Sequence, residues 1–324
     1  MDHPEAAVTT DLDYSAAVAA AVRAPSLHNS QPWRFRLRDG AIEVWRDLDR
    51  RLPTTDPAGW GARLAGGAAV FNLRLALAWQ GWEPLARLLP EPSEPDLLAV
   101  VAPARPRPAT PVEQRLWHAL WRRHSNRAPF WPDPVPAPAR AELTAAATAE
   151  GGWLELLIGP GPVAALAGVA RAADQVLMQD PAYRAELAAW TRTGPAADGV
   201  PAGAGGLRPE PQDLLPQRPF SEHPRGPVVD FEPQPLVAVL GTAADTAGDQ
   251  LIAGLALQRV LLTATDQRLA VSLLSQPIEL PGAREQLRLA LQQAGTPQMV
   301  LRIGYGRPGG PTPRRPVTEV FTSE

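Results

Sequence analysis

The chain has 324 residues, of which 45% are hydrophobic and 20% are charged, a balance typical of soluble globular proteins. Its net charge of -3 offers no basic field for nucleic acid, and no apolar run is long enough to cross a bilayer. The absence of cysteine excludes disulfides, thiolate nucleophiles and cysteine-ligated metals. Because the first residues are acidic and lack an apolar core, they do not resemble a signal peptide. We therefore expect a cytoplasmic protein that binds neither nucleic acid nor membrane.

The first hundred residues are predicted to form helices and a β-hairpin. A first helix ends where Ala24 precedes Pro25, because proline disfavours the helical conformation in the residue before it. Apolar and basic residues then alternate on both sides of an Asp39-Gly40 turn, which indicates a hairpin. The predicted elements of this part are helices over 14–23 and 65–80 and strands over 33–38, 41–45 and 97–101.

A proline-rich segment over 103–111 predicts a boundary between two parts of the chain. The second part is predicted to contain helices over 112–123, 139–149, 162–178, 247–266 and 282–293, and strands over 153–158, 236–241, 269–274 and 298–305. The helix that starts at residue 162 has an alternative end at residue 190.

Residues 191–230 lose all periodicity and are rich in glycine and proline. A structureless stretch of this length inside a compact domain is usually a lid, a binding loop or a disordered segment. We interpret it as a candidate lid.

Two apolar helices, 67–78 and 253–264, have similar sequences, and each leads into a strand. The similarity indicates a duplicated α+β unit. The alternative is that any two buried helices share an apolar pattern.

Several common motifs are absent or misplaced. The run Gly304-Tyr-Gly-Arg-Pro-Gly follows a predicted strand and matches the spacing of a dinucleotide-binding loop, but prolines at 308, 311 and 313 prevent the helix that must come next. A chain without lysine has no P-loop, and the five histidines lack the spacing of a metal site.

The segment 122–130 reads Arg-Arg-His-Ser-Asn-Arg-Ala-Pro-Phe and follows an amphipathic helix. A phosphate monoester requires fixed cationic side chains and short hydrogen-bond donors, and this segment supplies both. The alternative is a solvated basic loop at a helix end, where cations also complement the helix dipole.

A polar loop between two prolines, Pro25-Ser-Leu-His-Asn-Ser-Gln-Pro32, leads into Trp33. Asparagine and glutamine carry both a donor and an acceptor, as the edge of a flavin pyrimidine ring requires. The alternative is a turn that caps the preceding helix.

Together these two segments resemble the nitroreductase superfamily, in which an R-x-S-x-R-x-F type segment holds the FMN phosphate and a P-S-x-x-N-x-Q-P-W type loop reaches the flavin from the partner subunit. Two later segments agree in order. The run Leu-Ser-Gln-Pro-Ile-Glu at 274–279 resembles the turn whose backbone amide donates to flavin N5, and the strand 302–306 with the later Pro-Arg-Arg-Pro at 313–316 resembles the closing strand and the basic residues near the phosphate.

The resemblance implies an α+β fold, a bound FMN and a set of cofactor-binding residues. The residues expected in this FMN site are Pro25, Ser26, Asn29, Gln31, Arg122, Arg123, His124, Ser125, Arg127, Gln276, Pro277, Ile278, Glu279, Arg314 and Arg315. Arg127 is expected to neutralise charge near flavin N1 and O2. No catalytic side chain and no metal are expected, because the flavin carries the chemistry.

The arrangement departs from that of an ordinary family member. The Asn/Gln loop lies in the first part of the chain and the phosphate segment in the second, so each part lacks what the other has. The chain therefore resembles the Acg-like branch, in which two tandem nitroreductase-like halves form a pseudo-dimer with one composite site. We expect halves at 1–105 and 106–324, with the lid at about 191–230, and a monomer as the functional unit.

Two functions remain open. The first is an FMN-dependent oxidoreductase that uses NAD(P)H to reduce nitro or quinone-type acceptors. The second is a flavin-binding protein that stores or shields reduced FMN beneath a closed lid, without ordinary nitroreductase turnover. They differ in whether the open face of the ring can be reached. A third alternative is a structural relic that binds no flavin.

Overall fold

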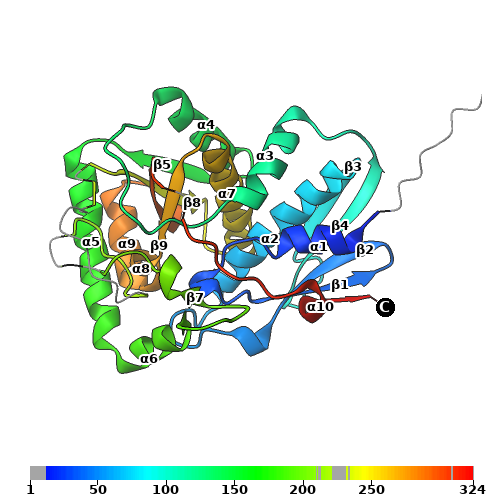
Figure 1. Ribbon diagram of the computed structural model, residues 1–324, viewed down its shortest axis with the longest axis horizontal. Coiled ribbons are helices and arrows are strands. Elements are labelled where there is room, and N and C mark those ends of the chain that lie inside the picture. Colours follow the sequence, from blue (N-terminus) through cyan, green and yellow to red (C-terminus); the bar gives the residue numbers. More distant parts are fainter. Residues whose placement is uncertain are drawn as a thin grey trace, which may run out of the picture.

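Two large β-sheets with helices packed against them make up most of the fold, and a two-stranded sheet lies apart from them (Figure 1). The computed structural model describes residues 12–208, 210, 213–220, 231–232, 234–307 and 309–323. The predicted α+β class is confirmed. Part of the expected lid, residues 221–230, lies outside the described residues. Within the described part of the chain, no helix is long and apolar enough to span a bilayer.

The first sheet has five strands in the order β11-β1-β2-β4-β3, in which β11 is the C-terminal strand Phe321–Ser323. Its hairpin turns at Asp39 and Gly40, whose φ values of 50° and 73° are those that a two-residue hairpin turn needs. The elements around this sheet are α1 (Tyr14–Ala21), β1 (Trp33–Arg38), β2 (Ala41–Arg46), α2 (Trp60–Trp79), β3 (Trp82–Leu88) and β4 (Leu97–Pro106).

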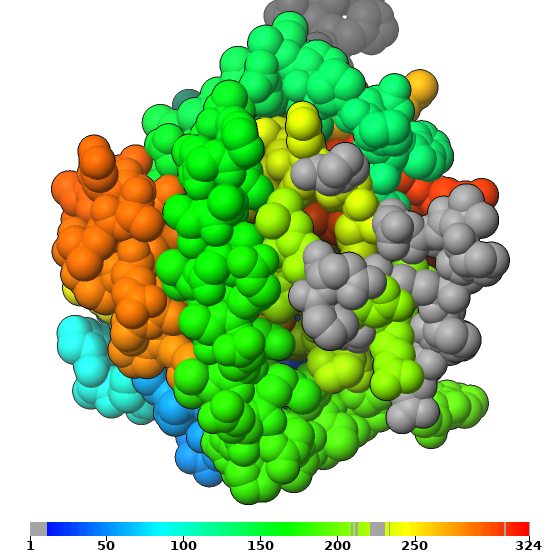
Figure 2. Space-filling view, turned by 90° about the vertical axis from the view of Figure 1, so that its left-hand side faces the viewer, coloured from blue at the N-terminus to red at the C-terminus, as the bar shows by residue number. Residues whose placement is uncertain are grey.

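The second sheet has four antiparallel strands in the order β5-β8-β10-β9. Its strands are β5 (Trp153–Leu157), β8 (Leu236–Thr242), β9 (Ala270–Leu274) and β10 (Thr296–Gly304). The helices that follow the first sheet are α3 (Pro111–Arg122), α4 (Ala137–Thr148), α5 (Pro160–Gln179), α6 (Pro181–Ala189), α7 (Ala247–Asp266), α8 (Gln276–Glu279) and α9 (Pro281–Ala290). On one face of the molecule, α5 runs beside α9 (Figure 2).

Helices α2 and α7 pack against each other between the two sheets (Figure 1). Each of them contributes to both hydrophobic cores. Trp60 and Leu64 of α2 belong to the core of the second sheet, whereas Leu255 and Leu262 of α7 belong to the core of the first. The two parts of the chain are therefore joined by a shared interior rather than by a linker alone.

The C-terminal segment crosses from the second sheet back to the first, as the red ribbon in Figure 1 shows. After β10 it reaches α10 (Val317–Val320) and β11 (Phe321–Ser323), and β11 pairs in parallel with β1. This crossing carries the segment around Arg314 past the loop that precedes β1. It therefore places residues 313–315 beside Asn29 and Gln31, which are far from them in the sequence.

The structure differs from the sequence predictions at four points. Residues 82–88 form a strand that was not expected, and β4 continues into the segment read as a joint as far as Pro106. The boundary at 105/106 lies at the end of that strand and stays a prediction. The helix from residue 162 does not continue to 190, because Pro181 starts a separate helix whose first turn is capped by Asp180. The stretch after residue 190 is not structureless, since β6 (Thr191–Arg192) pairs with β7 (Val200–Pro201).

Candidate functional site

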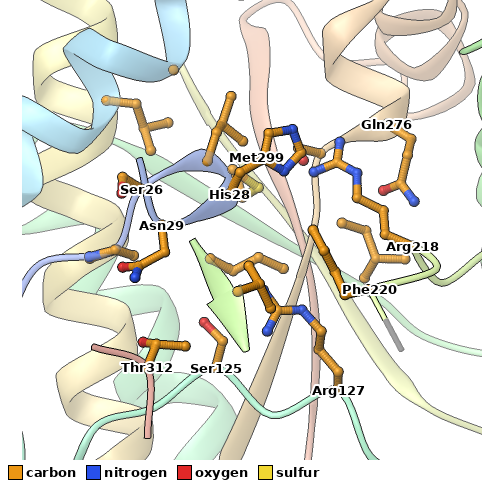
Figure 3. Close-up of a pocket in the computed structure, with 18 of the residues that line it drawn as sticks. Ser26, His28, Asn29, Ser125, Arg127, Arg218, Phe220, Gln276, Met299 and Thr312 are labelled. Carbon is orange, nitrogen blue, oxygen red and sulfur yellow. The ribbon is translucent and has the colours of Figure 1, made fainter. Parts of the chain in front are cut away.

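A pocket lies between the two sheets, and segments that are widely separated in the sequence line it (Figure 3). The loop that follows α1 supplies one wall, and the segment after α3 supplies another. Further lining residues come from the start of α2, from Leu257 of α7 and from Met299 of β10. The others are Val200, residues 216–220, the end of β9 with the start of α8, and residues 312–314. The pocket is thus a composite of both parts of the chain.

One end of the pocket is strongly cationic. Arg123 and Arg314 line it, Arg123 being buried and Arg314 half-buried, and Arg23 lies close enough to lower the pKa of both. Arg123 donates from Nη2 to the carbonyl of Arg23 at 3.1 Å, but its Nε and Nη1 have no hydrogen-bond partner among the described residues, and neither does Nε of Arg314. Within the described residues, none of these three arginines forms an ion pair with a carboxylate.

The pKa values at this end reflect burial and like charge. Burial, and then Arg23, lower the pKa of Arg123 to about 10. The pKa of Arg314 is also lowered well below its ordinary value by burial, Arg123 and Arg23. The pKa of His124 falls to about 4 because of burial and the neighbouring arginines, so its imidazole is neutral at pH 7. An anion bound here would relieve the mutual repulsion of the arginines.

The segment that carries Arg123 is held against β9. Ser125 forms an isolated parallel bridge with Val271, and the amide of Asn126 donates to the carbonyl of Val271 at 2.9 Å. The side chain of Asn126 donates in turn to the carbonyl of Arg307 at 2.6 Å. These contacts place Ser125 on the pocket wall, where Figure 3 shows it beside Thr312.

The other end of the pocket contains Arg127, Arg218, Phe220, His28 and Gln276 (Figure 3). Arg218 pairs with Glu279, donates from Nε to the Tyr183 hydroxyl at 3.2 Å, and has a raised pKa because these attractive partners outweigh its burial. Burial, and then Arg218, lower the pKa of Arg127 to about 10. This end therefore brings two guanidinium groups together, of which one has a carboxylate partner.

The loop after α1 has a strained backbone, with φ values of 52° at His28, 55° at Asn29 and 52° at Gln31. Asn29 donates to the carbonyls of Gly199 and Pro313 at 2.9 and 3.0 Å and accepts from Arg314 at 2.9 Å. Its side-chain amide therefore ties the loop to two other segments.

Gln31 has a similar role deeper in the fold. Its Nε2 donates to the carbonyl of Ala197 at 2.8 Å, and its Oε1 accepts from the amide of Arg315 at 2.8 Å. Both amide side chains of the predicted flavin-binding loop thus anchor residues 197–199 and 313–315. Their assignment to the flavin stays a prediction.

The structure brings about half of the predicted site residues to the pocket wall. The predicted residues that line it are Pro25, Ser26, Asn29, Arg123, Ser125, Arg127, Gln276 and Arg314. The predicted residues that do not line it are Gln31, Arg122, His124, Pro277, Ile278, Glu279 and Arg315.

The predicted residues outside the pocket have other contacts. Arg122 is exposed, and Arg315 pairs with Asp47 at 3.3 Å and Glu319 at 3.5 Å. Pro277 lies within the short helix α8, where the amides of Ile278 and Glu279 both donate to the carbonyl of Ser275. Those two amides are therefore already used within the protein.

Sequence reasoning missed several residues that line the pocket, chiefly His28, Arg218, Phe220, Met299 and Thr312. His28 was visible inside the predicted loop, where a histidine between two prolines is a usable signal. Arg218 and Phe220 belong to a stretch without periodicity, so no pattern indicated which of its side chains would point inward.

Comparison with known proteins gives close relatives along almost the full length. The chain is 32% identical over 330 residues to "Putative NAD(P)H nitroreductase acg" of Mycobacterium tuberculosis (strain ATCC 25618 / H37Rv). The aligned region covers 98% of this chain and 97% of the relative. It is 33% identical over 313 residues to "Putative NAD(P)H nitroreductase Rv3131" of the same strain, covering 93% of this chain and 88% of the relative. No family model matches the chain.

Among solved structures, similarity is found to the FMN- and NADPH-dependent nitroreductase NfnB from Sphigopyxis sp. strain HMH, with 18% identity, coverage of 63% of this chain and 96% of that one, and a TM-score of 0.42. A nitroreductase with bound FMN from Bacteroides fragilis gives 11% identity, 62% and 92% coverage, and a TM-score of 0.38. We base no assignment on TM-scores this low. The sequence relatives show that the chain belongs to the acg-type family of NAD(P)H nitroreductases.

Proposed function

We propose that the pocket binds one FMN, with the phosphate held by Arg123, Arg314 and Arg23. The observation that carries the proposal is the set of buried guanidinium nitrogens of Arg123 and Arg314 that lack partners among the described residues. Buried polar groups are normally paired, so unpaired cationic donors that line a pocket indicate an anionic ligand. Ser125 and Thr312 line the same pocket and offer neutral donors for further phosphate oxygens.

The bound FMN would supply the hydride and electron transfer that NAD(P)H-dependent reduction of a nitro or quinone-type acceptor requires. The protein's own residues would hold and orient the cofactor. The names of the sequence relatives support NAD(P)H as the reductant. The described residues contain no cluster of side chains that could hold a metal ion.

The same proposal treats the chain as a pseudo-dimer of two halves, about 1–105 and 106–324, that acts as a monomer with one site. The pocket supports it, because both halves supply walls. The crossing of α2 and α7 supports it as well, since a Cβ on Gly67 would meet the carbonyl of Leu251, and a Cβ on Gly254 would meet the carbonyl of Leu64. This reciprocity, each glycine against the residue three positions before the other, is what a local two-fold relation produces.

A second function, a flavin-binding protein with a closed lid, is favoured by the contacts of residues 191–220. Asp198 pairs with Arg50 at 2.5 Å and with Arg192 at 2.7 Å, while Arg218 pairs with Glu279. Together with the bonds from Asn29 and Gln31, these contacts fasten the segment over the pocket at several points. Such a lid would slow the approach of a nicotinamide to the ring.

The test is the flavin content of the purified chain. We expect flavin absorbance that corresponds to one FMN per chain, released as FMN on denaturation and identified by chromatography. Purified chain that neither contains FMN nor binds it when it is added would refute the proposal. Two FMN per chain, or a site that requires two chains, would refute the pseudo-dimer while leaving the cofactor intact.

A further inference from the structure

A second cavity, of about 390 Å³, lies at one end of the second sheet. Leu157 at the end of β5, Leu236 at the start of β8 and Ile303 near the end of β10 line it, and antiparallel pairing brings these positions to the same end of the sheet. The segment 130–135 and the start of α5 supply further walls. Among the described residues, none lines both this cavity and the pocket between the sheets. Its volume falls within the range of about 300–1,000 Å³ that small-molecule sites occupy.

Apolar side chains and prolines make up most of the lining of the second cavity. The ring of Phe130 is buried and lies against the backbone of β10, since a Cβ on Gly304 would lie 2.8 Å from it. Trp131 and Ile158 also line the cavity, yet they are 52% and 57% exposed. Large apolar side chains that stay in water around an apolar cavity are typical of a binding site.

Two acids line the second cavity, and neither determines the charge inside it. Glu232 is buried, pairs with Arg302 at 2.8 Å and accepts from the amide of Phe130 at 2.9 Å, so its charge is neutralised within the protein. Asp133 is exposed, where water and salt screen its carboxylate. A ligand in the cavity would therefore meet little negative charge.

Arg140 of α4 is the one cation among the described residues that line the second cavity. It is half-buried, and within the described part of the chain its guanidinium group forms no ion pair and no hydrogen bond. A guanidinium group presents its donors in a planar fork that matches the two oxygens of a carboxylate. The cavity thus combines an apolar wall with an unused carboxylate-binding group.

We propose that the second cavity binds an aliphatic monocarboxylate of medium chain length. Arg140 pairs with the carboxylate, and the hydrocarbon chain lies among the apolar side chains, where it covers Trp131 and Ile158. A cationic ligand would be repelled by Arg140, and a neutral ligand would leave the guanidinium group without a counter-ion. The site goes beyond the proposed function, because none of its residues is assigned to the FMN.

The first experiment measures the binding of hexanoate, octanoate and decanoate to the purified chain by titration calorimetry, at concentrations below those at which they form micelles. We expect one site per chain. The affinity should rise by roughly tenfold or more for every two methylenes, because each buried methylene contributes about fourfold. Octanoate should also bind at least about tenfold more tightly than the uncharged octanamide, as one charge-assisted contact allows.

Two variants, each with a matched control, place the ligand in this cavity. Arg140→Met should remove the preference for octanoate over octanamide, whereas Arg87→Met, which removes an exposed arginine of β3, should keep it. Ala164 is an exposed residue of α5 that lines the cavity, so Ala164→Phe should narrow it and weaken decanoate binding by about tenfold or more. Ala165→Phe, at the next exposed position of α5, should have little effect. The Ala164 pair also decides the matter where Arg140→Met fails to fold.

The outcomes separate the second cavity from the proposed function. Absence of binding, equal affinity for octanoate and octanamide, or binding that neither Arg140→Met nor Ala164→Phe weakens would overturn the proposal. Binding that is lost in Arg123→Met instead would overturn it as well, because the carboxylate would then lie at the arginine cluster of the other pocket. Flavin content, recorded for each preparation, tests the FMN independently: octanoate binding to a chain that never binds FMN refutes the proposed function and supports the cavity.

Discussion

Gly67 of α2 and Gly254 of α7 meet backbone to backbone. A Cβ on Gly67 would lie 2.1 Å from the carbonyl oxygen of Leu251, and a Cβ on Gly254 would lie 2.1 Å from that of Leu64. Neither atom is the end of a flexible side chain, so neither can move aside alone. The close approach of α2 and α7, and with it the width of the pocket between the sheets, depends on glycine having no side chain at these two positions.

Substituting alanine for either glycine should therefore destabilise the fold. Forcing a methyl group into a packed backbone contact typically costs about 1–3 kcal/mol, despite the better helix propensity of alanine. The measurement is the free energy of unfolding in urea. Gly168→Ala in α5 is the matched control, because an added Cβ there meets no atom within 4 Å. That control should be neutral or stabilising by up to about 1 kcal/mol, and equal effects at Gly67 and Gly168 would contradict the close-contact argument.

The double variant Arg123→Met, Ser125→Ala should lose most of its FMN. Each charge-assisted phosphate contact is worth about 1.5–3 kcal/mol, so removing two predicts an affinity loss of at least about a hundredfold. Flavin content at purification and the dissociation constant for added FMN are the readouts. Arg115→Met removes a surface arginine and should retain the cofactor. Undiminished flavin in the double variant would mean that the phosphate lies elsewhere.

The parts of the fold that the sequence predicts well are those with local patterns. The hairpin strands and the helix at 247–266 were predicted almost to the residue, because alternation, turn chemistry and an apolar face are local signals. Strand β3 was missed because Pro84 interrupts it. Proline is tolerated there since β3 is the outermost strand of its sheet, a position that only the tertiary structure reveals.

The residues of the candidate site also fall into those with a local sequence signal and those that only the tertiary structure reveals. Arg123 and Ser125 were predicted from a motif, whereas Arg23 and Phe220 enter through contacts between segments that are distant in sequence. Asn29 was predicted as a flavin contact because of its motif, but its amide also binds the backbone of Gly199 and Pro313. A motif identifies the loop, and only the packing of the other segments shows how many of its donors are already used.

Glu113 provides a test of local stability that does not depend on any ligand. It closes a capping box with Thr110 at the start of α3 and pairs with Arg107, and chiefly the Arg107 hydrogen bond lowers its pKa from 4.5 to about 2. A carboxyl whose pKa is lower in the folded state stabilises the fold above its unfolded pKa, and this contribution is lost as the pH falls.

Glu113→Gln should therefore cost about 1 kcal/mol at pH 7, a value that allows for solvent screening at this partly exposed site. The difference from the parent chain should shrink as the pH falls from 4.5 towards 2. Urea unfolding at several pH values measures it, with Glu94→Gln at an exposed turn as the control. A cost that stays constant across this range would show that the charge of Glu113 contributes little.

The last prediction distinguishes a working reductase from a closed flavoprotein. Asp198 accepts from both Arg50 and Arg192, and its neighbours Ala197 and Gly199 accept from Gln31 and Asn29. We call these contacts of residues 197–199 the latch. Within it, the carboxylate of Asp198 is shared by the two arginines. Asp198→Asn removes the charge and keeps the shape, so the segment should open more often while the pocket behind it stays intact.

Losing about 1.5–3 kcal/mol of charge-assisted bonding would raise the open population by roughly tenfold or more. If opening limits the reaction, the rate of NADPH oxidation with a quinone acceptor should rise by a similar factor, at unchanged flavin content. Asp49→Asn, which breaks an exposed pair with Arg34, should leave the rate as it is. Rapid turnover by the parent chain that Asp198→Asn does not increase would contradict this prediction, because opening of the segment would then not be the slow step. Of the two proposed functions, only the NAD(P)H-dependent reductase would remain.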